Sequence, residues 1–247
     1  MENKFPTVYD KEIKENLPHL NNYPEMLPFI GTNYGKMKSK IFILGESHYI
    51  DKLVINKLNA ISVKSPLNVT GDNRFLTDWY NQNSSEFDKD TSGWLFTRGN
   101  IDGIEVNSIN NKTIRFYWNL RKELESNVEL IDSKNVFSNF VYYNYFQRPA
   151  LVDGGSIAND SIDNEKAYET LRYMAEKFNP HKIIFATIKG WDAFYKIRKS
   201  PSIFDEINVD FVPHASCKWW NTPSQKYGNR ENPKMKGKEK FIFLLKK

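Results

Sequence analysis

The chain has 247 residues, of which 40% are hydrophobic and 26% charged, enough for one large domain or two small ones with a sizeable core. Its 35 Lys and Arg against 30 Asp and Glu give a formal net charge of +5, which permits a polyanionic partner without requiring one. The single cysteine, Cys217, excludes an internal disulfide and a four-cysteine zinc or iron–sulfur site. The sequence has neither a signal-peptide pattern nor an apolar run of about 18 residues, so we expect a cytoplasmic protein without membrane contact.

Four short runs have the pattern of buried strands: Lys40–Gly45, Val136–Tyr143, Lys182–Thr187 and Val209–Pro213. They are apolar at nearly every position, which is typical of parallel strands covered on both faces. Apolar residues at helical spacing predict helices over Ile114–Leu124 and Tyr168–Phe178, and a short one from Gly190. The alternation predicts one α/β domain over residues 1–247, with three α/β/α layers around a central, mostly parallel four-stranded sheet.

Three segments lie outside this scheme. Residues up to about 38 are predicted to be an N-terminal extension. The long polar stretch of about 65–111 contains many aromatic residues, which indicates an insertion that contributes to a site rather than a linker. Residues 224–240 are rich in Lys, Asn and Gly and are interpreted as a solvated loop, followed by an apolar run that we expect to form an edge strand.

Polar side chains follow the ends of the predicted strands, where open α/β sheets bind their ligands. Glu46, Ser47 and His48 follow the first strand, and Asn144 and Arg148 follow the second. Lys189 follows the third strand, and His214, Ala215 and Ser216 follow the fourth. A carboxylate, an amide and two histidines from separate strands can therefore converge for acid–base chemistry.

Each candidate also has a structural interpretation. Glu46 can cap a helix, the two histidines can be satisfied structural residues, and Asn144 can close a turn. Ser47 and His214 also suggest an esterase, although the sequence around Ser47 lacks the second glycine of a nucleophile elbow.

Taken together, the residues from Lys40 to Trp220 resemble the uracil-DNA glycosylase superfamily. Its members carry a Gly-Gln-Asp-Pro-Tyr or Gly-Glu-x-Pro-Gly motif after the first core strand and a His-Pro-Ser-like motif after the last. Here these places hold Gly45-Glu46-Ser47-His48-Tyr49 and His214-Ala215-Ser216. Both motifs depart from the pattern: each lacks its proline, and Ser47 stands where the best-known branch has a catalytic aspartate. Glu46 instead matches the iron–sulfur branch, whose cluster cysteines are missing here.

The resemblance implies roles for these residues in cleaving an N-glycosidic bond. Glu46 would stabilise the oxocarbenium-like sugar and orient water, and His214 would donate a hydrogen bond to the departing base. Asn144 would read the base edge. The remaining substrate contacts would come from Tyr49, Ser47, His48, Phe96 and Ser216, with Phe96 stacking on the base.

DNA is the partner that this resemblance implies, with the target base flipped out of the helix. Arg148, Lys189 and Lys218 would hold phosphates, and Trp219 and Trp220 would act near the flipped base, unless both tryptophans belong to the core. The sequence leaves open whether the DNA is single- or double-stranded.

We therefore expect a DNA glycosylase-like hydrolase of DNA repair, acting on a modified or deaminated base without metal or other cofactor. The alternative is a catalytically inactive nucleic-acid or nucleotide binding module of the same fold.

Overall fold

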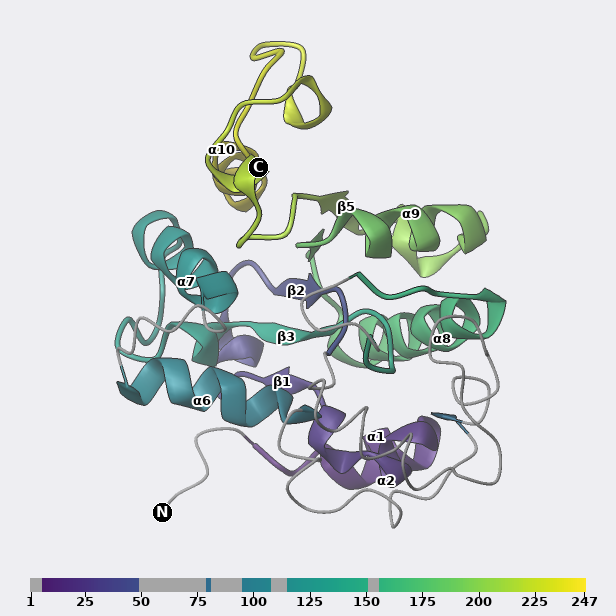
Figure 1. The fold of residues 1–247 in the computed structure, drawn as a ribbon. Helices are drawn as coiled ribbons and strands as arrows, with labels where there is room; N and C mark the ends of the chain where they lie inside the picture. The colour runs from purple at the N-terminus through teal and green to yellow at the C-terminus, as the bar shows by residue number, and fades with distance from the viewer. Residues whose placement is uncertain (1–5, 49–78, 81–94, 108–114, 151–155) are drawn as a thin grey trace, which may run out of the picture.

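The computed structural model describes residues 6–48, 79–80, 95–107, 115–150 and 156–247. They form a five-stranded sheet of order β1-β3-β2-β4-β5 (Figure 1). The strands are β1 Phe29–Ile30, β2 Ile41–Gly45, β3 Val141–Asn144, β4 Lys182–Phe185 and β5 Asn208–Phe211. The four strands from β3 to β5 in this order pair in parallel, and β1 pairs with β3 antiparallel.

The α/β class is confirmed, whereas the expectation of four strands is wrong because β1 adds a fifth, antiparallel strand. This strand lies in the segment predicted to be an extension, and its two residues are too short to show a periodic pattern. The second predicted strand also begins later than expected, because Val136–Asn139 form the 3₁₀ helix η6.

The helices are α1 Asp10–Asn16, α2 His19–Asn22, α6 Thr97–Asn107, α7 Arg115–Asn127, α8 Ser161–Phe178, α9 Ile188–Ile197 and α10 Gly237–Lys246. Short 3₁₀ helices are η1 Pro24–Met26, η2 Tyr34–Lys36, η7 Ile203–Asp205, η8 Lys218–Trp220 and η9 Gln225–Tyr227. The predicted helices correspond to α7, α8 and α9. None of the described helices is long and apolar enough to cross a membrane.

The expectation of a C-terminal edge strand is wrong, because the run Phe241–Leu245 lies within α10. Phe241, Leu244 and Leu245 recur at helical spacing, and all three are buried. A short apolar run satisfies both strand and helix patterns, and packing on the rest of the domain decides between them.

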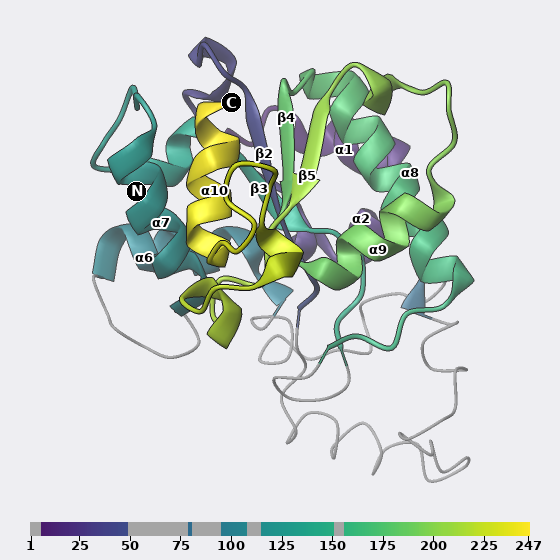
Figure 2. The same ribbon diagram turned by 90° about the horizontal axis from the view of Figure 1, so that it is seen from above.

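Helices cover both faces of the sheet, as Figures 1 and 2 show. Phe42 and Leu44 of β2 face a core that includes residues of α1, α2, α8 and α9. The alternate residues Ile41 and Ile43 face a second core with residues of α6, α7 and α10. Because successive side chains of a strand point to opposite faces, the continuous apolar run in β2 supplies both cores.

The chain continues in register beyond the carboxyl ends of β2 and β3. The Tyr145 N–H donates to the Gly45 carbonyl over 3.0 Å, and the Phe146 N–H donates to the Glu46 carbonyl over 2.9 Å. Farther along, the Ala150 N–H donates to the His48 carbonyl over 2.7 Å. These bonds fix the backbone of the two segments that carry Glu46 and Asn144.

Arg148 is buried against the start of α8, where its guanidinium forms two 2.6 Å hydrogen bonds to the carboxylate of Asp163. It also donates to the Ala158 carbonyl over 2.7 Å. Asp163 in turn completes a capping box with Asp160 at the N-terminus of α8. The expectation that Arg148 holds a phosphate is therefore wrong, because only 1% of its side chain is exposed and its donors are engaged within the fold.

The substitution Asp163→Asn tests this buried pair. We expect it to lower the free energy of unfolding by about 3–5 kcal/mol, because it leaves the Arg148 charge buried without its counterion. Urea denaturation measures the loss. Glu169→Gln in the exposed Lys166–Glu169 pair is the control and should cost no more than about 0.5 kcal/mol. Equal effects of the two substitutions would contradict the assignment.

Candidate functional site

Glu46 directly follows β2, and donors from two other segments hold its carboxylate. Oε1 accepts hydrogen bonds from the Ser156 hydroxyl and, over 3.3 Å, from the Ile157 N–H. Oε2 accepts from the Thr187 hydroxyl over 2.9 Å. An ionised carboxylate offers about four lone-pair sites, so these three donors leave room for about one more, such as a water.

Thr187 connects Glu46 to α9. Its side-chain oxygen accepts a 3.2 Å hydrogen bond from the Gly190 N–H, as an N-cap residue does, while its hydroxyl hydrogen points to Glu46. The Glu46 carboxylate therefore lies near the positive end of the α9 dipole, which favours negative charge there. A threonine before a helical pattern is a recognisable cap signal, whereas its bond to Glu46 depends on the neighbouring strand and has no sequence signature.

His214 follows β5, and the geometry around its ring determines which nitrogen carries the proton. Nδ1 lies 3.4 Å from the Ser216 backbone nitrogen and 2.8 Å from the Ser216 hydroxyl oxygen. Because a backbone N–H can only donate, Nδ1 accepts and the ring hydrogen is on Nε2. Burial lowers the pKa of His214, and the Glu46 carboxylate acts in the opposite direction. The ring is thus neutral at pH 7, with an Nε2–H available as a donor and Glu46 within electrostatic range.

Helix α7 positions this histidine. The Phe116 ring stacks on the imidazole with ring centroids 4.4 Å apart and an interplanar angle of 30°. One turn away, the Asn119 side-chain amide donates a 2.7 Å hydrogen bond to the Ala215 carbonyl. Sequence reasoning missed both residues, because a Phe on the apolar face of a helix and an Asn beside it are ordinary features of an amphipathic helix.

Asn144 lies at the end of β3, opposite Gly45 of β2. Its Oδ1 accepts a 3.1 Å hydrogen bond from the Tyr142 hydroxyl, which fixes the amide. A Cβ at Gly45 would lie 2.2 Å from Asn144 Oδ1 and 2.3 Å from the Tyr142 hydroxyl, so this arrangement requires glycine. The Nδ2 group makes no hydrogen bond to a residue that the structure describes.

The two residues after Glu46 are both buried. The Ser47 hydroxyl has no hydrogen-bond partner among the described residues. His48 Nε2 lies 3.1 Å from the hydroxyl oxygen of Thr97, the first residue of α6, and burial lowers the pKa of His48 to about 4. His48 therefore connects the loop after β2 to α6 rather than supplying a charge.

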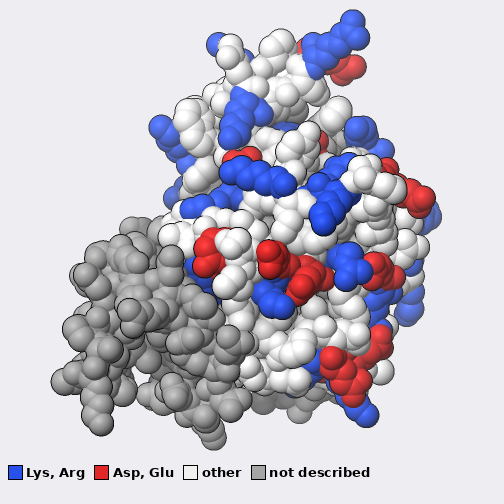
Figure 3. Space-filling view, turned by 90° about the vertical axis from the view of Figure 1, so that its right-hand side faces the viewer, with Lys and Arg blue, Asp and Glu red and all other residues white. Residues whose placement is uncertain are grey.

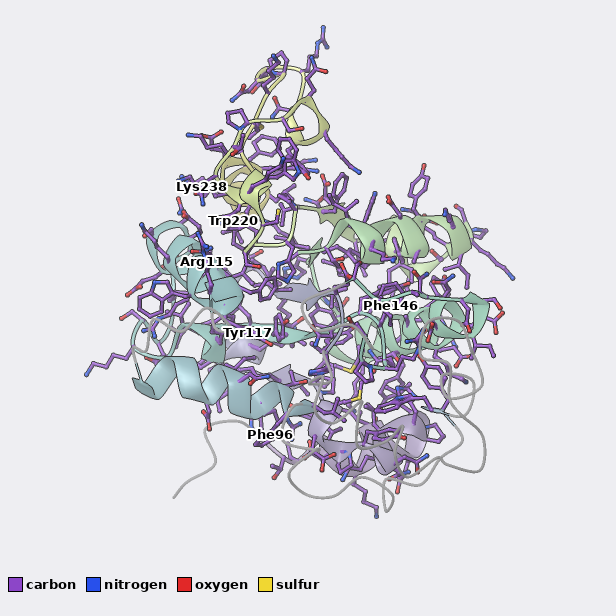
Figure 4. The ribbon with its side chains drawn as sticks, viewed as in Figure 1. Phe96, Arg115, Tyr117, Phe146, Trp220 and Lys238 are labelled. Carbon is purple, nitrogen blue, oxygen red and sulfur yellow. The ribbon has the colours of Figure 1, made fainter. Side chains whose placement is uncertain are left out.

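Phe96 precedes α6 and is 42% exposed (Figure 4). The bond between Thr97 and His48 places the backbone next to Phe96 close to the end of β2. Its predicted stacking on a base stays a prediction, and Tyr49 lies outside the described residues.

The predicted nucleic-acid contacts occupy different environments. The Lys189 ammonium donates to the Ile157 carbonyl beside Glu46. Lys218 lies over the Trp219 ring, 4.6 Å from its centroid, and Trp219 is 36% exposed. Trp220 is only 2% exposed and packs on Phe241 of α10, so the expectation that it contacts nucleic acid is wrong and its alternative place in the core is correct.

The described residues contain no group of three His, Cys, Asp or Glu side chains placed to hold a metal ion together. Comparisons of the chain with protein-family models, with curated proteins and with solved structures find no match.

The protonation of His214 can be measured directly by NMR titration of its ring nitrogens. We expect the Nε2–H form at pH 7 and a pKa below 6.5, because burial disfavours the charged ring. Phe116→Leu should move this pKa upward by admitting water to one face of the ring. The same titration of Phe204→Leu, in the other core, is the control and should leave His214 unchanged. A protonated His214 at pH 7 would contradict the assignment.

His48 should make folding stability depend on pH. Its pKa is about 4 in the folded state against an ordinary 6.5, so the unfolded chain binds the additional proton as the pH falls below 6.5. Stability should therefore decrease between pH 6.5 and about 4, by up to about 1.4 kcal/mol per pH unit for this residue. His48→Gln should flatten the slope measured by urea denaturation, and an unchanged slope would contradict the assignment.

Proposed function

We propose that this protein is a DNA glycosylase-like hydrolase that cleaves the N-glycosidic bond of a modified or deaminated base. The observation that supports this most is the pairing of a carboxylate with a neutral imidazole at one edge of the sheet. Glu46 is held by Ser156, Ile157 and Thr187, and His214 carries its proton on Nε2.

The reaction requires a negative group near the sugar and a hydrogen-bond donor near the departing base. As the bond between C1′ and the base nitrogen breaks, the sugar gains positive charge and the base leaves with the electron pair. The Glu46 carboxylate stabilises the sugar, and the His214 Nε2–H donates a hydrogen bond to a base oxygen where negative charge grows. A water oxygen then bonds to C1′. One of its hydrogens is donated to the unoccupied lone pair of Glu46, and that proton passes to the departed base.

Asn144 supplies the recognition of the base in this proposal. Its Oδ1 accepts from Tyr142 and keeps a second lone pair, and its Nδ2 donors are available. One donor and one acceptor match the edge of a pyrimidine-like imide. The Ser47 hydroxyl offers a further polar contact at the same strand end, because it is buried without a partner among the described residues.

One observation favours the binding module as a second candidate. Three donors already occupy most of the acceptor capacity of Glu46, which leaves little for activating water. In a binding module, the Glu46 carboxylate would have a structural role: it would position Ser156 and Thr187 around a ligand.

A base-excision panel separates the two candidates. Labelled single- and double-stranded oligonucleotides that contain uracil, hypoxanthine, xanthine or alkylated bases are incubated with the protein, and abasic product is scored. We expect product on at least one substrate and a loss of roughly 10²-fold or more in turnover for Glu46→Gln. Glu206→Gln, which removes the same charge at an exposed position before β5, is the matched control and should retain activity.

The outcomes are distinct. Product formed equally by wild type and Glu46→Gln would remove Glu46 from the mechanism. Retention of oligonucleotide without product on any substrate would support the binding module instead.

A further inference from the structure

The net positive charge of the chain comes from its C-terminal end. Residues 218–247 contain nine Lys and Arg and two Glu, a net charge of +7. The other 217 residues contain 26 Lys and Arg and 28 Asp and Glu, a net charge of −2. The overall excess of +5 therefore comes from one contiguous segment rather than from a generally basic surface.

Residues 218–240 of this segment form a projection that we call the basic lobe, with seven Lys and Arg and two Glu, a net charge of +5. It rises from the body of the domain beside α10 in Figure 1. In Figure 3, the projecting part carries mainly Lys and Arg with a little acidic surface, whereas most of the Asp and Glu on that face lie lower, on the body. The excess of basic residues therefore lies apart from most acidic residues on this face of the molecule, as it does in the sequence.

The lobe is exposed to solvent, as expected, but it also has hydrogen-bonded structure of its own. Ser224 and Met235 pair in an antiparallel bridge through hydrogen bonds of 2.9 and 3.3 Å. Gly228 packs so closely on Pro233 that a Cβ would lie 2.1 Å from the Pro233 carbonyl oxygen. Tyr227 and Met235 are buried. Its cations are therefore displayed on a preorganised frame, which lowers the entropic cost of binding.

Most cations of the lobe are not neutralised. Lys236 pairs with Glu239, and Lys240 pairs with Asp210 of β5. The other cations of the lobe form no ion pair with a described residue: Lys218, Lys226, Arg230, Lys234 and Lys238. Arg115 of α7 extends this surface, since α7 packs against α10 and both Arg115 and Lys238 are labelled there in Figure 4.

The lobe begins two residues after Ser216, so it is joined directly to the loop that holds His214. At this junction the exposed Trp219 ring lies against the Lys218 ammonium. An aromatic ring beside unpaired cations matches a chain of phosphates with flat bases between them.

We propose that the basic lobe is a nucleic-acid-binding surface that holds the phosphodiester backbone next to the site of Glu46 and His214. The cations of the lobe contact phosphates, and Trp219 stacks on an unpaired base. The choice of a DNA probe rests on the proposed function, whereas the charge and the exposed ring argue for the binding surface independently.

An anionic membrane fits the lobe less well as a partner than a nucleic acid does. Membrane-surface helices expose an apolar face to lipid, whereas the apolar residues Phe241, Leu244 and Leu245 of α10 are buried in the domain. A nucleic acid needs only the phosphate contacts and the stacking ring that the lobe displays.

The test measures binding rather than cleavage, using the Glu46→Gln chain so that turnover cannot affect the result. Affinity for fluorescent 30-nucleotide oligomers, single- and double-stranded, is measured as a function of salt concentration. The triple substitution Lys226→Ala, Arg230→Ala and Lys234→Ala should weaken binding roughly tenfold at low salt and reduce the slope of log K against log salt by about 2. Lys11→Ala, Lys196→Ala and Lys199→Ala remove the same charge from exposed positions elsewhere and should preserve both values.

A second substitution keeps the test independent of lobe folding. Trp219→Ala should weaken single-stranded binding about fivefold or more, with little change in the salt slope. Thermal unfolding of every variant checks its fold. Wild-type affinity and slope in the triple variant would overturn the proposal, as would binding to phosphatidylserine vesicles in the absence of oligonucleotide binding. Oligonucleotide binding through the lobe without base excision by the wild type would leave the lobe established and refute only the glycosylase.

Discussion

The candidate site depends on how the Glu46 carboxylate is stabilised. Half-buried beyond β2, it loses part of its hydration and must recover hydrogen bonds from the protein. Two segments supply them: Ser156 and Ile157 before α8, and Thr187 at the start of α9. One charged group therefore connects the ends of β2 and β4 with the entrance to α8. The parallel pairing of β2 with β4 brings Thr187 to Glu46, and the pairing of β2 with β3 brings the chain that leads to Ser156 to the same side, so the site depends on the sheet topology.

A second constraint keeps His214 neutral. Phe116 covers one face of the ring and Ser216 engages Nδ1, so burial outweighs the attraction of Glu46 for an imidazolium. The outcome is a fixed carboxylate and a fixed neutral donor at the same sheet edge. A fully charged Glu–His ion pair would instead satisfy itself and offer less to a reaction that develops separated charges. The balance between burial and attraction therefore decides whether this edge is a structural ion pair or a reactive site.

The sequence predicted the parallel strands and the helices that have long, regular apolar patterns, because burial on both faces leaves a clear signal in β2 and β4. It did not predict β1, whose two residues owe their strand conformation to pairing with β3. It misplaced the end of the chain, since the run from Phe241 is apolar at strand-like and helix-like spacings alike. Glu46, Asn144 and His214 were predicted as site residues because they follow the ends of predicted strands. The residues that orient them, Thr187 and Phe116 among them, act through long-range contacts that no local pattern encodes.

Arg148 and Lys218 show that the sequence alone does not tell whether a basic residue forms a buried ion pair or lies at the surface. Both were candidates for phosphate contacts, yet the guanidinium of Arg148 is enclosed with Asp163, where its bidentate geometry stabilises the start of α8. Lys218 remains at the surface with Trp219. A cation that is paired inside the fold, as Arg148 is, therefore adds little to the positive potential at the surface. On the body of the domain, acidic residues offset the remaining basic ones, whereas the basic lobe has few acidic neighbours to do so. The lobe can therefore produce a positive field that extends into solvent, and this field would attract a polyanion to the sheet edge from that side.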